Sequence, residues 1–293
     1  ILNFFFLVTL LYLFSRKTNI SENFYSDKLK RPFVYVYDNK GNKVNILLVE
    51  FVFNEDKADD YDFYLKNKDN YIFLGITSYL QFPNPVVNKF DPYSDPKHKA
   101  WKYDYKSMFD GWLHCFRDPN KYLLPSIPRA LISESDFGDE TVLKPDNNVE
   151  KIYDFMYSCP ISFANENKTC EMDWTASNKN WELAQKCLNI MCNKFKLKGL
   201  LVGRHNCKLP KGCTNLMTTT KFIDWYKFIE KYKQSKFLFV PNINDASPRI
   251  ITEALSSDIP ILINQNIIGG WKYINEKTGE FFQNEKDLPF VLE

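Results

Sequence analysis

The sequence predicts an α/β protein of two domains, of which the C-terminal one is a doubly wound parallel sheet, and three observations lead to this prediction. A chain of 293 residues is long enough to bury two modest hydrophobic cores. The run Lys-Pro-Asp-Asn-Asn at 144–148 has the composition of a linker. Beyond it, short apolar runs alternate with segments of helical periodicity, a pattern that favours right-handed βαβ units.

The N-terminal domain is expected over residues 33–148. Runs of β-branched and aromatic residues separated by turn residues predict strands at 33–37, 44–53, 71–77 and 130–133. Residues 105–116 are expected to form a helix, because apolar side chains at 108, 109, 112, 113 and 116 follow helical spacing. On such a helix Asp110 and His114 would lie one turn apart, and His114 could orient a sugar or act as a base. The simpler alternative places His114 in the core.

The C-terminal domain is expected over residues 149–293. Its predicted helices are 178–196, 221–233 and 248–257, and its predicted strands are 153–158, 199–202, 237–240 and 259–263. In sheets of this kind ligands bind beyond the carboxyl ends of the strands. The loops that follow the strands are therefore where a site is expected.

Charge and cysteine content argue against two classes of function. The formal net charge is +2, and lysines alternate with acidic residues along most of the chain, so no nucleic-acid partner is expected. The seven cysteines include no Cys-x-x-Cys pair, so no metal site is predicted. Cys207 and Cys213 bracket a loop that contains Pro and Gly, which makes them a candidate disulfide.

An apolar run stands at the start of the sequence. Residues 1–14 read ILNFFFLVTLLYLF and are followed by Ser, Arg and Lys. We interpret this run as a signal anchor or transmembrane segment of a single-pass membrane protein, with residues 15–32 as a polar stem. A cleaved signal peptide and a buried helix are the alternatives. An ER- or Golgi-type lumen and the cytosolic face both stay open as compartments.

The residues that predict chemistry lie in the segment 239–282. A buried strand ends at Val240, and Ser247 and Pro248 suit the N-cap and the first position of the following helix. A helix start favours an anion such as a diphosphate. Asp245 precedes this helix and Glu253 lies inside it, and a carboxylate accepts hydrogen bonds from two vicinal hydroxyls. This combination predicts a nucleotide-sugar site.

Residues 241–260 read PNINDASPRIITEALSSDIP. This segment resembles the acidic motif of family 4 (group 1) glycosyltransferases, which has two acidic residues with seven between them. The resemblance extends over residues 153–282 and includes Lys179 and residues 278–282. It implies a GT-B fold of two Rossmann-like domains. It also implies transfer from a UDP- or GDP-linked sugar to a hydroxyl of a glycan, lipid or protein, with retention of configuration and without a metal or other cofactor.

The resemblance implies a role for each matching residue. Glu253 would hold the ribose hydroxyls, Asp245 would contact the donor sugar, and Lys179 would neutralise the diphosphate as the sugar leaves. Backbone N–H groups of residues 247–249 would help to bind the phosphates. The pair Gly269 and Gly270 would permit close approach of the backbone to the donor.

The sequence departs from the family pattern at three points. Residues 246–248 read Ala-Ser-Pro, where the family usually has Gly, an aromatic residue and Gly. Asp245 stands where glutamate is usual, and no arginine precedes Lys179, so Arg249 and Arg204 are the candidates to supply the missing charge. A noncatalytic nucleotide- or sugar-binding module and a nucleotide-sugar epimerase are therefore alternative functions. A structural, membrane-anchored protein is a third.

Overall fold

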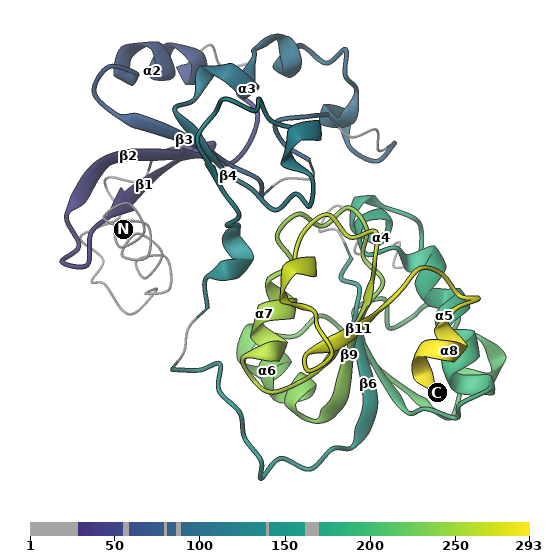
Figure 1. Ribbon diagram of the computed structural model, residues 1–293. Coiled ribbons are helices and arrows are strands. Elements are labelled where there is room, and N and C mark those ends of the chain that lie inside the picture. The colour runs from purple at the N-terminus through teal and green to yellow at the C-terminus, as the bar shows by residue number, and fades with distance from the viewer. Residues whose placement is uncertain (1–28, 55–58, 79–80, 86–88, 139–140, 162–169) are drawn as a thin grey trace. The chain divides into compact units, whose positions relative to one another are not determined.

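A computed structural model describes residues 29–54, 59–78, 81–85, 89–138, 141–161 and 170–293 (Figure 1). The chain divides into two compact units, Ile1–Asp139 and Glu140–Glu293, which we call unit 1 and unit 2. The apolar run at 1–14 and most of the expected stem lie outside the described residues. Within the described ranges no helix is long and apolar enough to cross a membrane, and the prediction of a single-pass membrane protein is corrected accordingly.

The described residues of unit 1 form a five-stranded sheet in the order β1-β2-β3-β4-β5. β1 runs antiparallel to β2, and the other neighbouring strands are parallel. The strands are β1 (Phe33–Tyr37), β2 (Lys43–Val49), β3 (Ile72–Ile76), β4 (Gly111–Leu113) and β5 (Arg129–Ala130). The helices are α2 (Asp59–Asn67) and α3 (Tyr105–Met108), with 3-10 turns η2 (Pro92–Ser94), η3 (Lys99–Lys102), η4 (Pro119–Lys121) and η5 (Glu134–Asp136).

The helix expected over 105–116 is wrong, because this segment divides into the short helix α3 and the strand β4. All three residues of β4 are buried, as befits a strand between two parallel neighbours. The ring of Trp112 covers Gly75 so closely that a Cβ on this glycine would lie 2.6 Å from it. A continuous apolar run of this kind satisfies helical spacing by accident, and its contacts with β3 and β5 decide its conformation.

The described residues of unit 2 form a six-stranded parallel sheet in the order β11-β10-β9-β6-β7-β8. Its strands are β6 (Tyr153–Ser158), β7 (Gly199–Val202), β8 (Met217–Thr220), β9 (Ser235–Val240), β10 (Ile261–Asn264) and β11 (Gly279–Phe282). Its helices are α4 (Trp174–Asn178), α5 (Trp181–Asn193), α6 (Trp225–Lys233), α7 (Arg249–Leu255) and α8 (Leu288–Leu292), with 3-10 turns η7 (Lys211–Cys213) and η8 (Trp271–Tyr273). The doubly wound sheet predicted from the sequence is thus confirmed.

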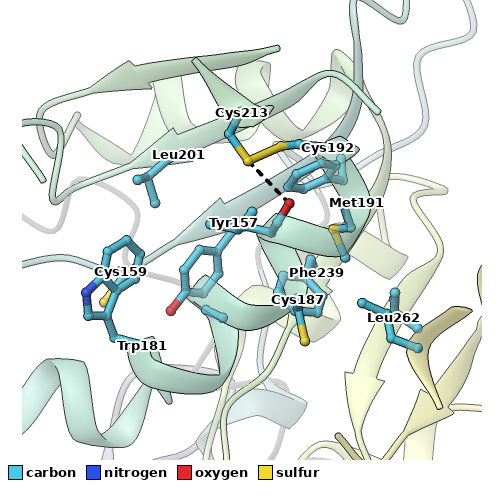
Figure 2. Close-up of a cluster of buried hydrophobic side chains, with 14 of the residues drawn as sticks. Tyr157, Cys159, Trp181, Cys187, Met191, Cys192, Leu201, Cys213, Phe239 and Leu262 are labelled. Atoms are coloured by element: carbon cyan, nitrogen blue, oxygen red, sulfur yellow. Dashed lines mark hydrogen bonds between the residues drawn. A yellow bond between two sulfur atoms is a disulfide. The ribbon is translucent and has the colours of Figure 1, made fainter. Parts of the chain in front are cut away.

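Side chains of the central strand alternate between two cores, one on each face of the sheet. Phe155 and Tyr157 of β6 join the core under α5 and α8, whereas Met156 joins the core under α6 and α7. Figure 1 shows these helix pairs on opposite sides of the sheet. Figure 2 shows the first core, where the ring of Tyr157 stacks on Trp181 with 6.0 Å between centroids. Burial on both faces explains why the inner strands β7, β9 and β10 are mostly apolar.

Two disulfides tie loops of unit 2 to its first core. Cys192 on α5 bonds to Cys213, and Cys170 bonds to Cys207. The disulfide expected between Cys207 and Cys213 is therefore wrong. η7 packs against α5, and this contact brings Cys213 to Cys192 of the helix.

Candidate functional site

A cavity of about 450 Å³ opens at the carboxyl ends of β6 and β9 in unit 2. From β6 the chain continues outward through β7 and β8, and from β9 it continues outward in the other direction through β10 and β11. The gap between β6 and β9 is therefore the topological switch point of the sheet, where open α/β sheets bind ligands. The lining residues are Ser158, Pro160, Lys179, Phe222, Ile223, Asp224, Trp225, Phe228, Phe239, Val240, Asn242, Asp245, Ser247, Pro248, Arg249, Ile250 and Glu253.

A lysine and an aspartate meet inside this cavity. The Nζ of Lys179 lies 2.7 Å from Oδ2 of Asp245, and their side chains are 24% and 17% exposed. The buried side chain of Asn242 donates to the same Oδ2 at 2.9 Å. Both charges therefore have hydrogen-bond partners while facing space that a ligand can enter. The sequence singled out Lys179 and Asp245, and the structure brings them together.

Lys179 is held at a sharp corner between α4 and α5, and is not within one helix as the range 178–196 predicted. Its carbonyl accepts from the Oη of Tyr157 at 3.0 Å, and its backbone N–H donates to Thr175 at 2.8 Å. The next residue, Asn180, has φ 51° in the left-handed region, which Asn tolerates better than most residues. Its amide also donates to the carbonyl of Pro241 at 3.1 Å, which fixes the corner to the end of β9.

Glu253 lies on α7 at the wall of the cavity, where its Oε1 accepts a hydrogen bond from the indole Nε1 of Trp225 at 3.0 Å. Burial raises the pKa of Glu253, while the hydrogen bond from Trp225 and the charge of Arg249 act in the opposite direction. Trp225 is the first residue of α6, which Asp224 caps by accepting from the N–H of Lys227. The carboxylate is thus oriented by a residue of another helix.

The start of α7 differs by one residue from the prediction. Pro248 occupies the N-cap position and the helix begins at Arg249, so Ser247 is not the N-cap. Ser247, Pro248 and Arg249 nevertheless all line the cavity. Pro248 provides no N–H, so the backbone donors at this end of the helix begin at Arg249, which is exposed.

Gly269 and Gly270 support the loop that carries Asp245 and do not line the cavity among the described residues. The N–H of Gly269 donates to the carbonyl of Asp245 at 2.9 Å, and a Cβ here would lie 1.8 Å from the carbonyl oxygen of Ala246. Gly270 has φ 79° and would meet Ile251 at 2.5 Å. Glycine is therefore required at 269 by the backbone of Ala246, and at 270 by the left-handed φ and the side chain of Ile251.

Arg204 lies in the interior of unit 2 and not at the cavity. Its side chain is 0% exposed, and its Nη2 lies 2.6 Å from Oδ1 of Asp173, the N-cap of α4. Its Nε donates to the sulfur of Cys159 at 3.0 Å. The ion pair links the loop after β7 to the start of α4, and the hydrogen bond to Cys159 adds the end of β6, so Arg204 supports the corner that carries Lys179.

His114 belongs to unit 1, where it directly follows β4. It is buried, its N–H donates to the carbonyl of Ala130 at 2.9 Å, and its ring stacks on Phe116 with 6.1 Å between centroids. Asp110 precedes the strand and accepts from the N–H of Phe73 at 2.8 Å. The expectation that Asp110 and His114 share a helix face is therefore wrong, because a strand separates them.

Among the residues of the cavity region that sequence reasoning missed, three hydrogen-bond to the site residues or hold the loop that carries them: Trp225, Asn242 and Asn180. The first two line the cavity, and Asn180 holds the corner beside it. Asp224 followed by an aromatic residue is a recognisable helix start, and it was the available signal for Trp225. Asn242 and Asn180 are single polar residues in loops, for which local sequence provides no comparable signal.

Comparison with known proteins supports the fold. No family model and no curated protein matches the sequence. Among solved structures, pneumococcal O-GlcNAc transferase GtfA, in complex with UDP and GlcNAc, matches with a TM-score of 0.51 and 10% identity over 78% of this chain and 45% of its own. A TarM variant from S. aureus, in complex with fondaparinux, alpha-GlcNAc-glycerol and UDP, matches with 0.55 and 12% over 77% and 44%. Sucrose-phosphate synthase from Thermosynechococcus elongatus matches with 0.54 and 13% over 79% and 60%.

These similarities show that the two sheets of this chain have the Rossmann-like architecture of GT-B glycosyltransferases, as predicted. The chain spans 44% of the length of TarM and 60% of the length of sucrose-phosphate synthase. At 10% to 13% identity the comparison supports the fold alone.

Proposed function

We propose that unit 2 binds a UDP- or GDP-linked sugar and that the protein transfers this sugar to a hydroxyl of a glycan, lipid or protein acceptor. The observation that carries the proposal is the pairing of Lys179 with Asp245 in the switch-point cavity, with Glu253 at the wall of the same cavity. This set offers one cation for a diphosphate and two carboxylates for sugar hydroxyls. The presence of UDP in the GtfA and TarM structures supports a uridine nucleotide among the candidates.

Each residue has a chemical task in this proposal. Lys179 stabilises the negative charge that develops on the diphosphate when the bond to the sugar breaks. Asp245 accepts a hydrogen bond from the donor sugar and is itself held by Asn242. Glu253 accepts from the ribose hydroxyls through the oxygen positions that Trp225 leaves available. Retention of configuration and independence of metals are proposed from the resemblance of residues 153–282 to family 4.

The corner between α4 and α5 supports this assignment on energetic grounds. The carbonyl of Lys179 and the side chain of Asn180 are both hydrogen-bonded to the sheet. Since the backbone is already fixed and the ammonium already lies in the cavity, binding a diphosphate requires little further ordering of the chain, and the ammonium exchanges only its partner Asp245 for the phosphate. A preorganised charge of this kind stabilises a transition state without a large reorganisation cost.

Isothermal calorimetry with UDP, GDP, ADP and their sugars tests the binding part of the proposal. One nucleotide should bind the wild-type protein. In thermal unfolding, the same nucleotide should raise the melting temperature of the protein as the ligand concentration increases. The Glu253→Ala variant should lose this binding, whereas Glu230→Ala, which changes an exposed glutamate of α6, should keep it. Absence of binding at millimolar nucleotide would contradict the proposal.

The reaction is tested by following the nucleotide-sugar that binds. A transferase consumes it rapidly only when a hydroxyl acceptor is supplied. Turnover to a new sugar without an acceptor would identify an epimerase. Binding with neither transfer nor hydrolysis across an acceptor library would identify a noncatalytic module.

A further inference from the structure

The hydrogen bond between Trp225 and Glu253 joins two helices at the wall of the cavity. Trp225 begins α6, Glu253 lies in the second turn of α7, and both side chains line the cavity. Trp225 as a whole residue is 37% exposed, and its indole Nε1 donates to the carboxylate. Tyr226, the next residue, is 65% exposed and does not line this cavity.

The contact between Trp225 and Glu253 is a directional hydrogen bond in addition to van der Waals packing. An indole N–H can only donate, and an ionised carboxylate can only accept, with roughly four lone-pair positions on its two oxygens. The bond at Oε1 uses one of these positions and leaves Oε2 fully available. It also restricts a side chain that otherwise rotates about three bonds.

We propose that Trp225 is a positioning residue, which holds the carboxylate of Glu253 in the orientation that accepts the ribose hydroxyls and so makes the site selective for ribonucleotides over 2′-deoxyribonucleotides. This inference rests on the proposed function, because it takes the ligand to be a nucleoside diphosphate. A carboxylate in a fixed orientation accepts hydrogen bonds from both ribose hydroxyls and loses one of them when the 2′-hydroxyl is absent. A mobile carboxylate can reorient toward the hydroxyl that remains, so it discriminates less between the ribonucleotide and the 2′-deoxyribonucleotide.

The test compares the dissociation constants of UDP and 2′-deoxy-UDP, or of GDP and 2′-deoxy-GDP, by calorimetry. We expect the wild-type protein to prefer the ribonucleotide by about tenfold or more, since it gains a hydrogen bond to a charged acceptor. Trp225→Phe keeps an aromatic ring but removes the N–H, and should reduce this preference by roughly twofold to tenfold through the lost ordering of Glu253. Tyr226→Phe, the control on the same helix, should leave the preference unchanged.

The ratio of the two dissociation constants distinguishes the positioning of Glu253 from a direct contact between the ring of Trp225 and the base. Loss of such a contact weakens both nucleotides equally and does not change the ratio. An unchanged ratio in Trp225→Phe, with nucleotide binding retained, would overturn the role of Trp225 and leave the proposed function intact. Failure of the wild-type protein to bind any of these nucleotides would overturn the proposed function and this inference together.

Discussion

Lys179 and Asp245 are 66 residues apart in the chain, yet Nζ of the lysine lies 2.7 Å from Oδ2 of the aspartate. The lysine comes from the corner between α4 and α5, and the aspartate from the loop between β9 and α7. Two opposite charges that share a ligand cavity compete with the ligand for each other. A diphosphate attracts the lysine and repels the aspartate, so the two residues should have opposite effects on nucleotide binding.

We predict that Lys179→Gln weakens the binding of a nucleoside diphosphate by about tenfold to a hundredfold, the value of a hydrogen bond to a charged group. Asp245→Asn should tighten binding of the same diphosphate several-fold, because it removes a negative charge and frees Lys179. Both variants should slow sugar transfer. Lys186→Gln, which breaks the exposed pair with Glu182 on α5, is the matched control and should change neither quantity. Equal weakening of nucleotide binding in Lys179→Gln and Asp245→Asn would contradict a competition between Asp245 and the diphosphate for Lys179.

The pH dependence of binding should identify Glu253. Burial raises its pKa, so protonation begins at a higher pH than for an ordinary glutamate, with a reference value of about 4.3. Because the carboxylate form accepts the hydroxyls, nucleotide affinity should fall as the pH falls through this raised pKa. The groups that face the carboxylate are Trp225 and Tyr232 of α6 and Arg249 of α7. Burial raises the pKa of Tyr232, so its phenol stays protonated over this range.

The control for this titration is Glu253→Gln. The phosphates of the nucleotide titrate in both proteins, so only the difference between the two pH profiles of binding reports on Glu253. Parallel pH profiles of nucleotide binding for the wild-type protein and Glu253→Gln would contradict the assignment of Glu253 to the ribose hydroxyls.

The raised pKa of Glu253 also affects folding stability, because the folded form binds this proton more tightly than the unfolded chain does. The contribution of Glu253 to stability is then greatest at low pH and falls as the pH rises through the folded pKa.

Substitution of Gly269 should damage both stability and nucleotide binding. In Gly269→Ala the new Cβ meets the carbonyl oxygen of Ala246 at 1.8 Å, and this backbone atom can move only with the loop that carries Asp245. We expect a loss of about 1–3 kcal/mol in the free energy of unfolding, together with weaker binding. Gly212→Ala meets an equally close atom at 1.7 Å, but this is the side-chain amide of the exposed Asn193, which can rotate away. Denaturant unfolding of the two variants should therefore differ clearly.

Replacement of Arg204 should reveal a structural residue. Arg204→Gln leaves the buried carboxylate of Asp173 without its charged partner, which typically costs about 3–5 kcal/mol. Arg249→Gln changes an exposed arginine and should leave the free energy of unfolding unchanged within about 0.5 kcal/mol. If Arg204→Gln instead unfolds like the wild-type protein and loses only nucleotide binding, Arg204 belongs to the donor site.

Local sequence was a good guide where one element decides its own conformation. β6 and β7 were predicted with the bounds that they have, because each is a short stretch rich in apolar or aromatic residues. β8 reads MTTT and is mostly only half buried at the edge of the sheet, so it has no apolar run to detect. β4 was mistaken for a helix, because its apolar run is compatible with both periods and only neighbouring strands distinguish them.

The sequence by itself determined the doubly wound architecture of unit 2 and the spacing of Asp245 and Glu253 around the loop and helix after β9. Tertiary structure alone decided that Lys179 pairs with Asp245, that Trp225 orients Glu253, and that Arg204 is buried. Periodicity reports which face of an element is apolar, since that face must leave water. It contains no information about which loops meet at the edge of the sheet, because those contacts depend on the order in which distant strands pair.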